Sequence, residues 1–328
     1  MIKNKIINKH IPVMLKEVKN YISTNKTINV IDATFGGGGY SASILESFKI
    51  NKLIAIDRDP ITKIFSRELE KKYPNNFNFI NGRFSQIDKL IKSVFSTHDK
   101  QLKFDIIIFD LGLSSNQLEE GQRGFSFIKD GPLNMNMGQS KLLASDIVNK
   151  FNEKEIADII FNLGGERHAK KIAKNIVKHR KLKFIKNTHE LSEIINKSIF
   201  FHKYKKTKIN PSTKTFQALR IHVNDELNEL KVALEKSEHL LAPKGRILVV
   251  SFQSLEDKIV KDFFNHKSGK RWRSSRHYPE LAEKGPITLK IITKKPIRPE
   301  ESEIQLNSRA RSAKLRVVEK LNLTSTVL

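Results

Sequence analysis

The first 110 residues alternate between short apolar runs and longer stretches with helical periodicity. Apolar runs of strand length lie at Ile28–Asp32, 52–57, 77–80 and Phe104–Asp110, and the stretches between them predict helices over about 41–48, 60–72 and 86–95. Strands that alternate with helices of this length predict a parallel, doubly wound sheet.

The pattern changes after about residue 138. Three helices are predicted over 153–163, 167–179 and Thr188–Ser198, followed by one long helix over 215–241. Strand patterns return at 245–252, 288–293 and 314–319. We therefore expect one α/β domain, made of residues 1–137 and 213–328, with an inserted helical domain over 138–212.

Composition narrows the class of protein. Hydrophobic residues make up 38% of the chain and charged residues 29%, and no run of about eighteen apolar residues predicts a membrane span. The N-terminus lacks the pattern of a secretory signal. With no cysteine, the chain cannot form disulfides, thiolate zinc sites or cysteine nucleophiles. These features favour a cytoplasmic protein without a membrane, and they leave the oligomeric state open, with a homodimer as one option.

The formal net charge of +25 indicates a polyanionic partner such as nucleic acid. An alternative is the codon usage of an AT-rich genome, since Lys, Asn and Ile are all abundant. The charge is uneven, however. Residues 170–186 and 202–208 are densely basic, whereas the surroundings of a glycine-rich turn at Asp32–Ser41 are nearly balanced.

That turn joins a predicted strand to a predicted helix, where glycines let backbone N–H groups approach a ligand. Its spacing differs from the dinucleotide fingerprint GxGxxG and is closer to the glycine turn of class I methyltransferases. Asp57 ends the next strand, where a carboxylate can accept both ribose hydroxyls or pair with Arg58. Phe84 follows the third strand and can pack against an adenine ring or belong to the core. Together these features favour a nucleoside cofactor at the carboxyl ends of the strands.

Asp110 ends the fourth strand and reaches the same edge. A carboxylate there can accept an N–H of an exocyclic amine, which directs the lone pair toward a methyl donor, or it can contact the amino-acid part of the cofactor. The absence of cysteine excludes covalent attack on a pyrimidine ring, so nitrogen or oxygen is the expected acceptor. The ten histidines show no metal-binding spacing.

Several ordered motifs resemble one family, the bacterial MraW-type methyltransferases that act on a cytosine N4 amine of small-subunit rRNA. The motifs are His10–Glu17, Asp32–Ser41, Phe109–Leu118, Arg123–Phe127, Asp130–Met137, Asn210–Leu227, Ser251–Lys261 and Ser308–Lys320. The resemblance implies an S-adenosylmethionine-dependent enzyme with a class I, Rossmann-like sheet and an inserted substrate-recognition domain. It also implies a 16S rRNA substrate in the decoding centre of the small ribosomal subunit.

Matching motifs carry the family's cofactor contacts onto seven residues, which are Gly38, Gly39, Tyr40, Asp57, Phe84, Asp110 and Gln117. The chain departs from the family's usual residues at five positions, since Gly37, Tyr40, Asn134, Asn136 and Gln253 replace Arg, His, Asp, Arg and His. Two other functions stay open at this point: an NAD-type oxidoreductase, which the missing GxGxxG disfavours, and a non-catalytic RNA-binding factor with a vestigial pocket.

Three further motifs allow two interpretations each. Arg309, Arg311, Lys314 and Arg316 can face phosphate or cover the outer side of an edge strand. Arg123, Phe125 and Phe127 can hold a splayed base by stacking or form a lid over the cofactor. Asn210–Arg220 can start a helix near the site, or Ser212 or Thr213 can simply cap that helix.

Overall fold

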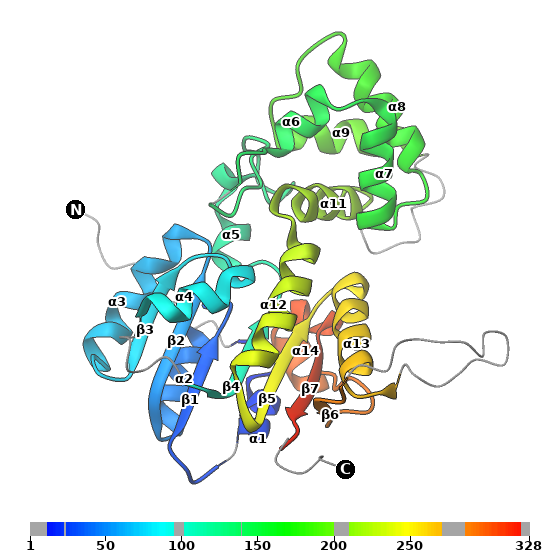
Figure 1. The fold of residues 1–328 in the computed structure, drawn as a ribbon. Helices are drawn as coiled ribbons and strands as arrows, with labels where there is room; N and C mark the ends of the chain where they lie inside the picture. Colours follow the sequence, from blue (N-terminus) through cyan, green and yellow to red (C-terminus); the bar gives the residue numbers. More distant parts are fainter. Residues whose placement is uncertain are drawn as a thin grey trace, which may run out of the picture. The chain divides into compact units, whose positions relative to one another are not determined.

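The computed structural model describes residues 12–22, 24–94, 102–138, 140–199, 210–270 and 286–322. The chain forms two compact units (Figure 1). One, the sheet unit, contains residues 1–112 and 227–328, and the other, the helical unit, contains residues 113–226.

The sheet unit is built on seven strands in the order β3-β2-β1-β4-β5-β7-β6. Strands β1 to β5 are mutually parallel where they pair, whereas β7 runs antiparallel to both β5 and β6. The strands are β1 (Ile28–Asp32), β2 (Ile50–Asp57), β3 (Phe77–Asn81), β4 (Phe104–Asp110), β5 (Leu241–Ser251), β6 (Leu289–Ile291) and β7 (Lys314–Lys320). The α/β class and the strand predictions are confirmed, and the antiparallel direction of β7 was not foreseen.

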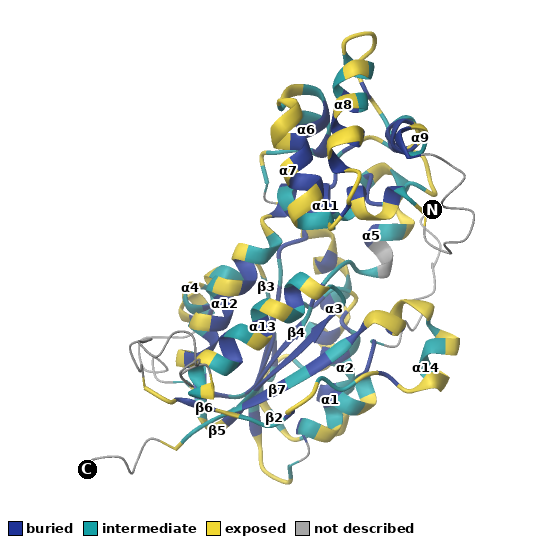
Figure 2. Ribbon diagram, turned by 90° about the vertical axis from the view of Figure 1, so that its right-hand side faces the viewer, coloured by how far each residue is buried: buried dark blue, intermediate teal, exposed yellow. Residues whose placement is uncertain are grey.

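Alternate side chains of each central strand enter two separate cores, as the period of a strand requires. Val30 belongs to one core and Ile31 to the other, and Ile106 and Ile107 divide in the same way. Because both faces of the sheet are covered, the strands read as nearly continuous apolar runs. In Figure 2 the central strands are accordingly dark blue, between helices with yellow outer sides.

Helices on each face supply the rest of these cores. The first core takes side chains from α1 (Leu15–Ile22), α2 (Gly39–Ser47) and α3 (Lys63–Lys72). The second takes them from α4 (Ile87–Val94), α12 (Glu226–Leu240) and α13 (Ser254–Lys267). Short 3-10 turns η1 (Pro60–Thr62), η2 (Phe84–Gln86) and η6 (Ser308–Ser312), with α14 (Glu301–Leu306), complete the described part of this unit.

The helical unit has a core of its own. Its helices are α5 (Ser115–Glu119), α6 (Ala144–Lys150), α7 (Glu153–Gly164), α8 (Ala169–Arg180), α9 (Thr188–Ser198) and α11 (Ser212–Asn224), with a 3-10 turn η4 (Gly121–Arg123). Local sequence sets the ends of α7. Asn152 and Glu155 form a reciprocal capping box, and Gly165 ends the helix in the left-handed region at φ +61°.

The predicted helix over 215–241 is wrong, because the structure contains two helices, α11 and α12, separated at Asp225. This residue has φ +52°, and its N–H returns to the carbonyl of His222 as in a helix C-terminus. Arg220 binds both carboxylate oxygens of Glu226 at 2.7 Å, across the break. Neither Gly nor Pro stands at the break, so it lacks the strongest local signals for a helix end.

The helical unit, residues 113–226, also covers a longer segment of the sequence than the expected insertion of residues 138–212. Phe125, Leu133, Met135 and Met137 precede residue 138 but pack into the helical core, as do side chains of α11 after residue 212. In the part of the chain that the structure describes, the longest apolar helices are too short or too polar to cross a membrane.

Candidate functional site

Three acidic side chains stand at the carboxyl ends of adjacent strands in the sheet unit. Asp32 ends β1, Asp57 ends β2 and Asp110 ends β4, and β1 lies between the other two strands. Parallel pairing brings these ends to one edge, because Asp32 pairs in register with Ala55 and with Ile108. This is the edge at which open α/β sheets bind ligands.

The glycine-rich turn follows β1 and leads into α2. Gly38 caps α2 with φ +78°, and a Cβ atom there would lie 2.7 Å from the ring of Phe35, which is fixed in the core. Only glycine fits this position. A Cβ atom on Gly37 would meet no atom within 4 Å, so the turn has open space at this position.

Asp32 stabilises the glycine-rich turn through hydrogen bonds to residues on both sides of the glycines. Its side chain is fully buried, accepts the hydroxyl of Ser41 at 2.7 Å and accepts the N–H of Thr34 at 3.3 Å. Burial raises the pKa of Asp32 to about 6, although these hydrogen bonds oppose the shift. Asp32 therefore shapes the turn, and the sequence had indicated it only as the acid before the glycines.

Asp57 ties the same turn to the end of β2. One carboxylate oxygen accepts the N–H of Gly36 at 2.7 Å, and the other accepts the N–H of Asp59 at 2.8 Å. Burial raises the pKa of Asp57 to about 7, with smaller contributions from Asp59 and Asp32. Each oxygen keeps a second lone pair for a hydroxyl group, since a carboxylate oxygen can accept two hydrogen bonds.

Asp110 has the least satisfied side chain of the three. Its backbone N–H donates to the hydroxyl of Thr34 at 2.7 Å, which links the ends of β4 and β1. Its Oδ1 atom is buried and has no hydrogen-bond partner among the described residues. Burial raises the pKa of this carboxyl well above its ordinary value, and the charges of Asp32 and Glu256 add to the effect. An unpartnered buried acceptor of this kind indicates a missing donor.

Phe84 starts η2, directly after β3, and is half-buried. Its ring meets the buried ring of Phe109 edge-to-face, with centroids 5.8 Å apart and an interplanar angle of 89°. One side of the Phe84 ring thus packs on the core, while part of it stays accessible.

Tyr40 points away from the ligand side of the turn. The side chain is 4% exposed, and its hydroxyl donates a hydrogen bond to the carbonyl of Val13. Burial, together with the charges of Asp110 and Asp32, raises the pKa of Tyr40 well above its ordinary value. The Tyr40 side chain therefore belongs to the core, and only the backbone of this residue remains at the turn.

Glu256 acts electrostatically on Asp110, and the sequence interpretation did not include it. It is 3% exposed in the first turn of α13 and accepts the N–H groups of Phe252 and Gln253 at 3.0 and 3.1 Å. An acid three residues into a helix is a capping signal that could have identified it. Gln253, which stands where the resembling family usually has His, is therefore the residue at the capped N-terminus of α13.

The structure brings six of the seven predicted contacts together in the sheet unit, whereas Gln117 lies on α5 of the helical unit. Gln117 is 8% exposed, and its side-chain oxygen accepts the N–H of Ser114 at 3.1 Å. Among the described residues, no cluster of His, Asp or Glu could hold a metal ion.

The structure places two of the motifs that the sequence left open to interpretation. Arg316 and Lys314 bind Asp257 at 2.6 and 3.1 Å, and their strand β7 lies between β5 and β6, so it is not the edge strand that the sequence interpretation assumed. Phe125 is 6% exposed and belongs to the core of the helical unit, while the partly buried Phe127 packs edge-to-face on Phe216.

Three asparagine side chains that the sequence interpretation had singled out form hydrogen bonds within their own loops. Asn210 accepts the N–H of Ser212 at 2.8 Å before α11, in place of the expected capping by Ser212 or Thr213. Asn134 accepts the N–H of Asn136 at 3.0 Å, and Asn136 accepts the N–H of Gly138 at 2.6 Å. The two asparagine departures thus stabilise the loop that contains them.

Comparison with known proteins assigns the family. Residues 7–321 match the MraW methylase family. The chain belongs to this family. The methylase is 43% identical to ribosomal RNA small subunit methyltransferase H of Methylobacterium nodulans over 95% of its own length and 90% of that protein. The proteins of the same name from Wolbachia pipientis and Rickettsia akari are each 44% identical, over 95% and 96% of this methylase and 99% and 100% of theirs.

Among solved structures, a putative methyltransferase from Streptococcus mutans in complex with SAH matches 98% of the methylase and 100% of that chain. The TM-score is 0.42, at 14% identity.

Proposed function

We propose that this methylase transfers a methyl group from S-adenosylmethionine to the N4 amine of a cytosine in 16S rRNA, in the decoding centre near the P site. Membership of the MraW methylase family supports methyl transfer, and relatives named for the RNA of the small ribosomal subunit support the substrate. The reaction then takes place in the cytoplasm, where ribosomal subunits assemble.

The residues at the sheet edge fit this cofactor. Carboxylates whose pKa values are raised by burial favour a cationic ligand, because a positive charge stabilises the ionised form that burial disfavours. Asp57 would accept the ribose hydroxyls, and Phe84 would contact the adenine ring. The backbone of Gly38, Gly39 and Tyr40 would line the turn. The resemblance to the family also names Gln117 as a cofactor contact. S-adenosylmethionine supplies an electrophilic methyl group on a sulfonium.

The observation that carries the proposal is the buried, unpartnered Oδ1 of Asp110. When ionised, this atom accepts an N–H, either from the target amine or from the amino group of the cofactor. In the first case it directs the amine lone pair toward the methyl group and can take the released proton. Most of the acceleration comes from in-line positioning of the amine, which the chain's own strand ends and turn determine.

A strain lacking this methylase tests the assignment. Nucleosides of its small-subunit rRNA, analysed by mass spectrometry, should lose N4-methylcytidine, and the gene carrying wild-type protein should restore it. Purified methylase should transfer methyl groups to isolated 30S particles or to naked 16S rRNA, with the modified base mapped in the decoding centre. Unchanged N4-methylcytidine in the deletion strain would leave a non-catalytic RNA-binding role instead.

Calorimetric titration with S-adenosylhomocysteine and with NADH distinguishes a methyltransferase from the alternative enzyme class, an NAD-type oxidoreductase. Binding of S-adenosylhomocysteine alone is expected, because the Asp57 carboxylate is present but the GxGxxG turn for a pyrophosphate is missing. Binding of NADH alone would contradict the proposed cofactor.

A further inference from the structure

A row of cations follows one side of α8 in the helical unit. Arg167, Lys170, Lys174, Lys178 and Lys181 are all exposed, and their spacing places them on one stripe opposite the buried side of the helix. We call these five residues the α8 basic face. At 1.5 Å per residue, the row from Lys170 to Lys181 extends over about 17 Å.

Codon usage does not explain this row. α8 contains no Asp or Glu, whereas α7 has a single lysine among three Asp or Glu residues, and the lysine of α9, Lys197, pairs with Glu193 at 3.4 Å. Like charges four residues apart destabilise a helix by about 0.2–0.5 kcal/mol per pair. Lys170, Lys174 and Lys178 have no hydrogen bond or ion pair with another described residue. Such a face is expected where an anion binds.

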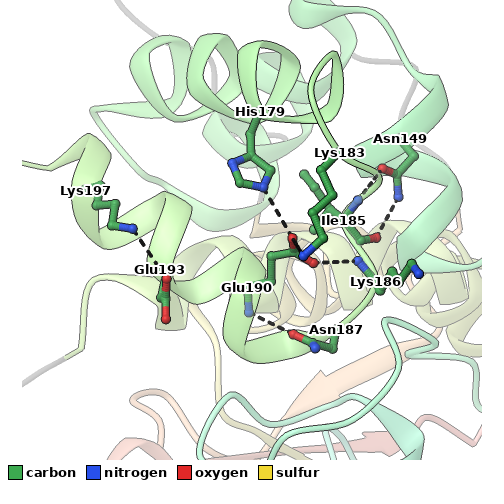
Figure 3. A network of polar contacts seen from close by, with 9 residues as sticks. All are labelled: Asn149, His179, Lys183, Ile185, Lys186, Asn187, Glu190, Glu193 and Lys197. Atoms are coloured by element: carbon green, nitrogen blue, oxygen red, sulfur yellow. Dashed lines mark hydrogen bonds and ion pairs between the residues drawn. The ribbon is translucent and has the colours of Figure 1, made fainter.

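The loop after α8 is held in one conformation by its neighbours (Figure 3). The side chain of Asn149 both donates to the carbonyl of Ile185, at 2.9 Å, and accepts its N–H, at 3.0 Å. Glu190 accepts the N–H of Lys186 at 2.9 Å and contacts His179 and Lys183 at 3.3 and 3.4 Å. These contacts fix the base of the loop, so little ordering entropy remains to be lost on binding.

Two large apolar side chains project from this fixed loop. Leu182 is 83% exposed and Phe184 is 52% exposed, and they alternate with the exposed Lys181 and Lys183. An exposed aromatic ring among lysines suits nucleic acid better than an acidic peptide, because bases stack on aromatic faces while phosphates meet the cations.

We propose that the α8 basic face and the loop residues 181–186 form an RNA-binding surface, on which the lysines of α8 contact successive phosphates and Phe184 stacks on an unpaired base. Naming ribosomal RNA as the ligand rests on the proposed function. The surface itself rests on the charge, exposure and fixed loop of the helical unit.

The lysines are tested with a triple variant, Lys170→Gln, Lys174→Gln and Lys178→Gln. The chain offers a matched control, Lys63→Gln, Arg67→Gln and Lys71→Gln, which removes three exposed cations with the same spacing from α3. Binding of a 16S rRNA decoding-centre hairpin is followed by fluorescence anisotropy over a series of salt concentrations. The α8 variant should lower the salt slope by about 3 and weaken binding at least tenfold at low salt.

The control variant should change affinity less than threefold and keep most of the slope. Equal losses in the two triple variants would overturn the proposal, because the effect would then be one of net charge alone. The α8 variant should also unfold at the same or a higher temperature than wild type, since it relieves repulsion within the helix. A merely structural role for these lysines predicts the opposite.

Phe184→Ala tests the stacking step, with Phe161→Ala as its control, because Phe161 is a similarly exposed ring on α7 at 58%. Loss of one stacked base should weaken RNA binding by about tenfold, and the Phe161 variant should bind as wild type does. Equal binding by all three proteins, or binding of polyglutamate as tight as that of RNA, would contradict the assignment. The affinity of every variant for S-adenosylhomocysteine should stay unchanged, so failure of the methyl-transfer proposal would be seen separately.

Discussion

Asp57 is oriented before any ligand arrives, because the N–H groups of Gly36 and Asp59 each hold one of its oxygens. Asp110 is the contrasting case, with a buried oxygen that has no partner in the described structure. The two carboxylates should therefore respond differently to substitution. One would act mainly in binding the cofactor and the other mainly in turnover.

Asp57→Ala should weaken binding of S-adenosylhomocysteine by about 1–3 kcal/mol, the cost of losing hydrogen bonds to a charged group. Asp110→Asn should chiefly lower turnover if its oxygen holds the target amine. Calorimetry and single-turnover methyl transfer measure the two effects. Equal loss of cofactor affinity in both variants would instead assign Asp110 to the cofactor's amino group.

The raised pKa of Asp57, about 7, predicts a pH dependence. The ionised carboxylate accepts ribose hydroxyls, so affinity for S-adenosylhomocysteine should fall up to about tenfold per pH unit below 7 and level off above 8. Asp57→Asn should flatten this part of the profile, as titrations at several pH values would reveal. Because folding raises this pKa, the stability contribution of Asp57 falls as the pH rises from about 4 to about 7. A profile that is unchanged in Asp57→Asn would assign the titration to another group.

At the level of single residues, the sequence predicted the acids well and their surroundings poorly. Asp57 and Asp110 could be predicted because each ends an apolar run, and strand ends of a parallel sheet meet at one edge. The environment of Tyr40 could not, because its partner Val13 is 27 residues away and nothing local marks that contact. Glu256 was missed although its position in the first turn of α13 is a capping signal, because its effect on Asp110 at the end of β4 depends on tertiary structure.

The break between α11 and α12 shows what determines element boundaries in this fold. Asn224, the last residue of α11, is buried and donates from its side chain to the carbonyls of Met135 and Arg220, while its oxygen accepts the N–H of Met137 at 3.0 Å. These contacts end the helix at a fixed place, and Asp225 then adopts a left-handed conformation. Periodicity continues across the break, so only tertiary contacts reveal it.

Substitution at Asp225 tests this account. Asp225→Gly should be neutral or slightly stabilising, because glycine adopts a positive φ without steric cost. Asp225→Val should lower the free energy of unfolding by about 1–2 kcal/mol, since a β-branched residue is strained there. Urea titrations of the two variants measure the difference. Similar stability for both would mean that the left-handed conformation is not required.

The sheet illustrates the same limit for strands. Apolar runs identified β1 and β4 to the residue, because a strand buried on both faces needs an unbroken apolar sequence. The antiparallel direction of β7 is set by its pairing with β5. In this pairing Val249 of β5 lies opposite Arg316 of β7, which is far away in the sequence. Direction of pairing leaves no local pattern, and so it was not predicted.

The whole molecule has separate cores for its two units, and the helical unit is a single continuous segment. The sequence predicted an insertion but placed its start at residue 138, because the preceding 25 residues have little periodicity. Their packing into the helical core is visible only in three dimensions, through side chains such as Phe125 and Leu133.

Residues 113–226, expressed alone, should therefore fold, since their core is formed within the segment. We expect helical circular dichroism and one cooperative thermal transition from this fragment. A shortened fragment of residues 138–212 is the natural comparison, and it should be less stable because it lacks Phe125, Leu133 and α11. A fragment 113–226 without a cooperative transition would show that the helical core depends on the rest of the chain.

The long interval between β4 and β5 also affects how the chain is made. β4 ends at Asp110, and its partner β5 begins at Leu241, so the ribosome must add about 130 residues between them, roughly ten seconds of synthesis. During that time β4 carries an apolar strand edge with no neighbour on one side, while the helical segment emerges and can collapse on its own core. An uncovered edge of this kind invites pairing with other chains. The nascent methylase is thus most vulnerable to aggregation after its cofactor turn has been synthesised and before its sheet is complete.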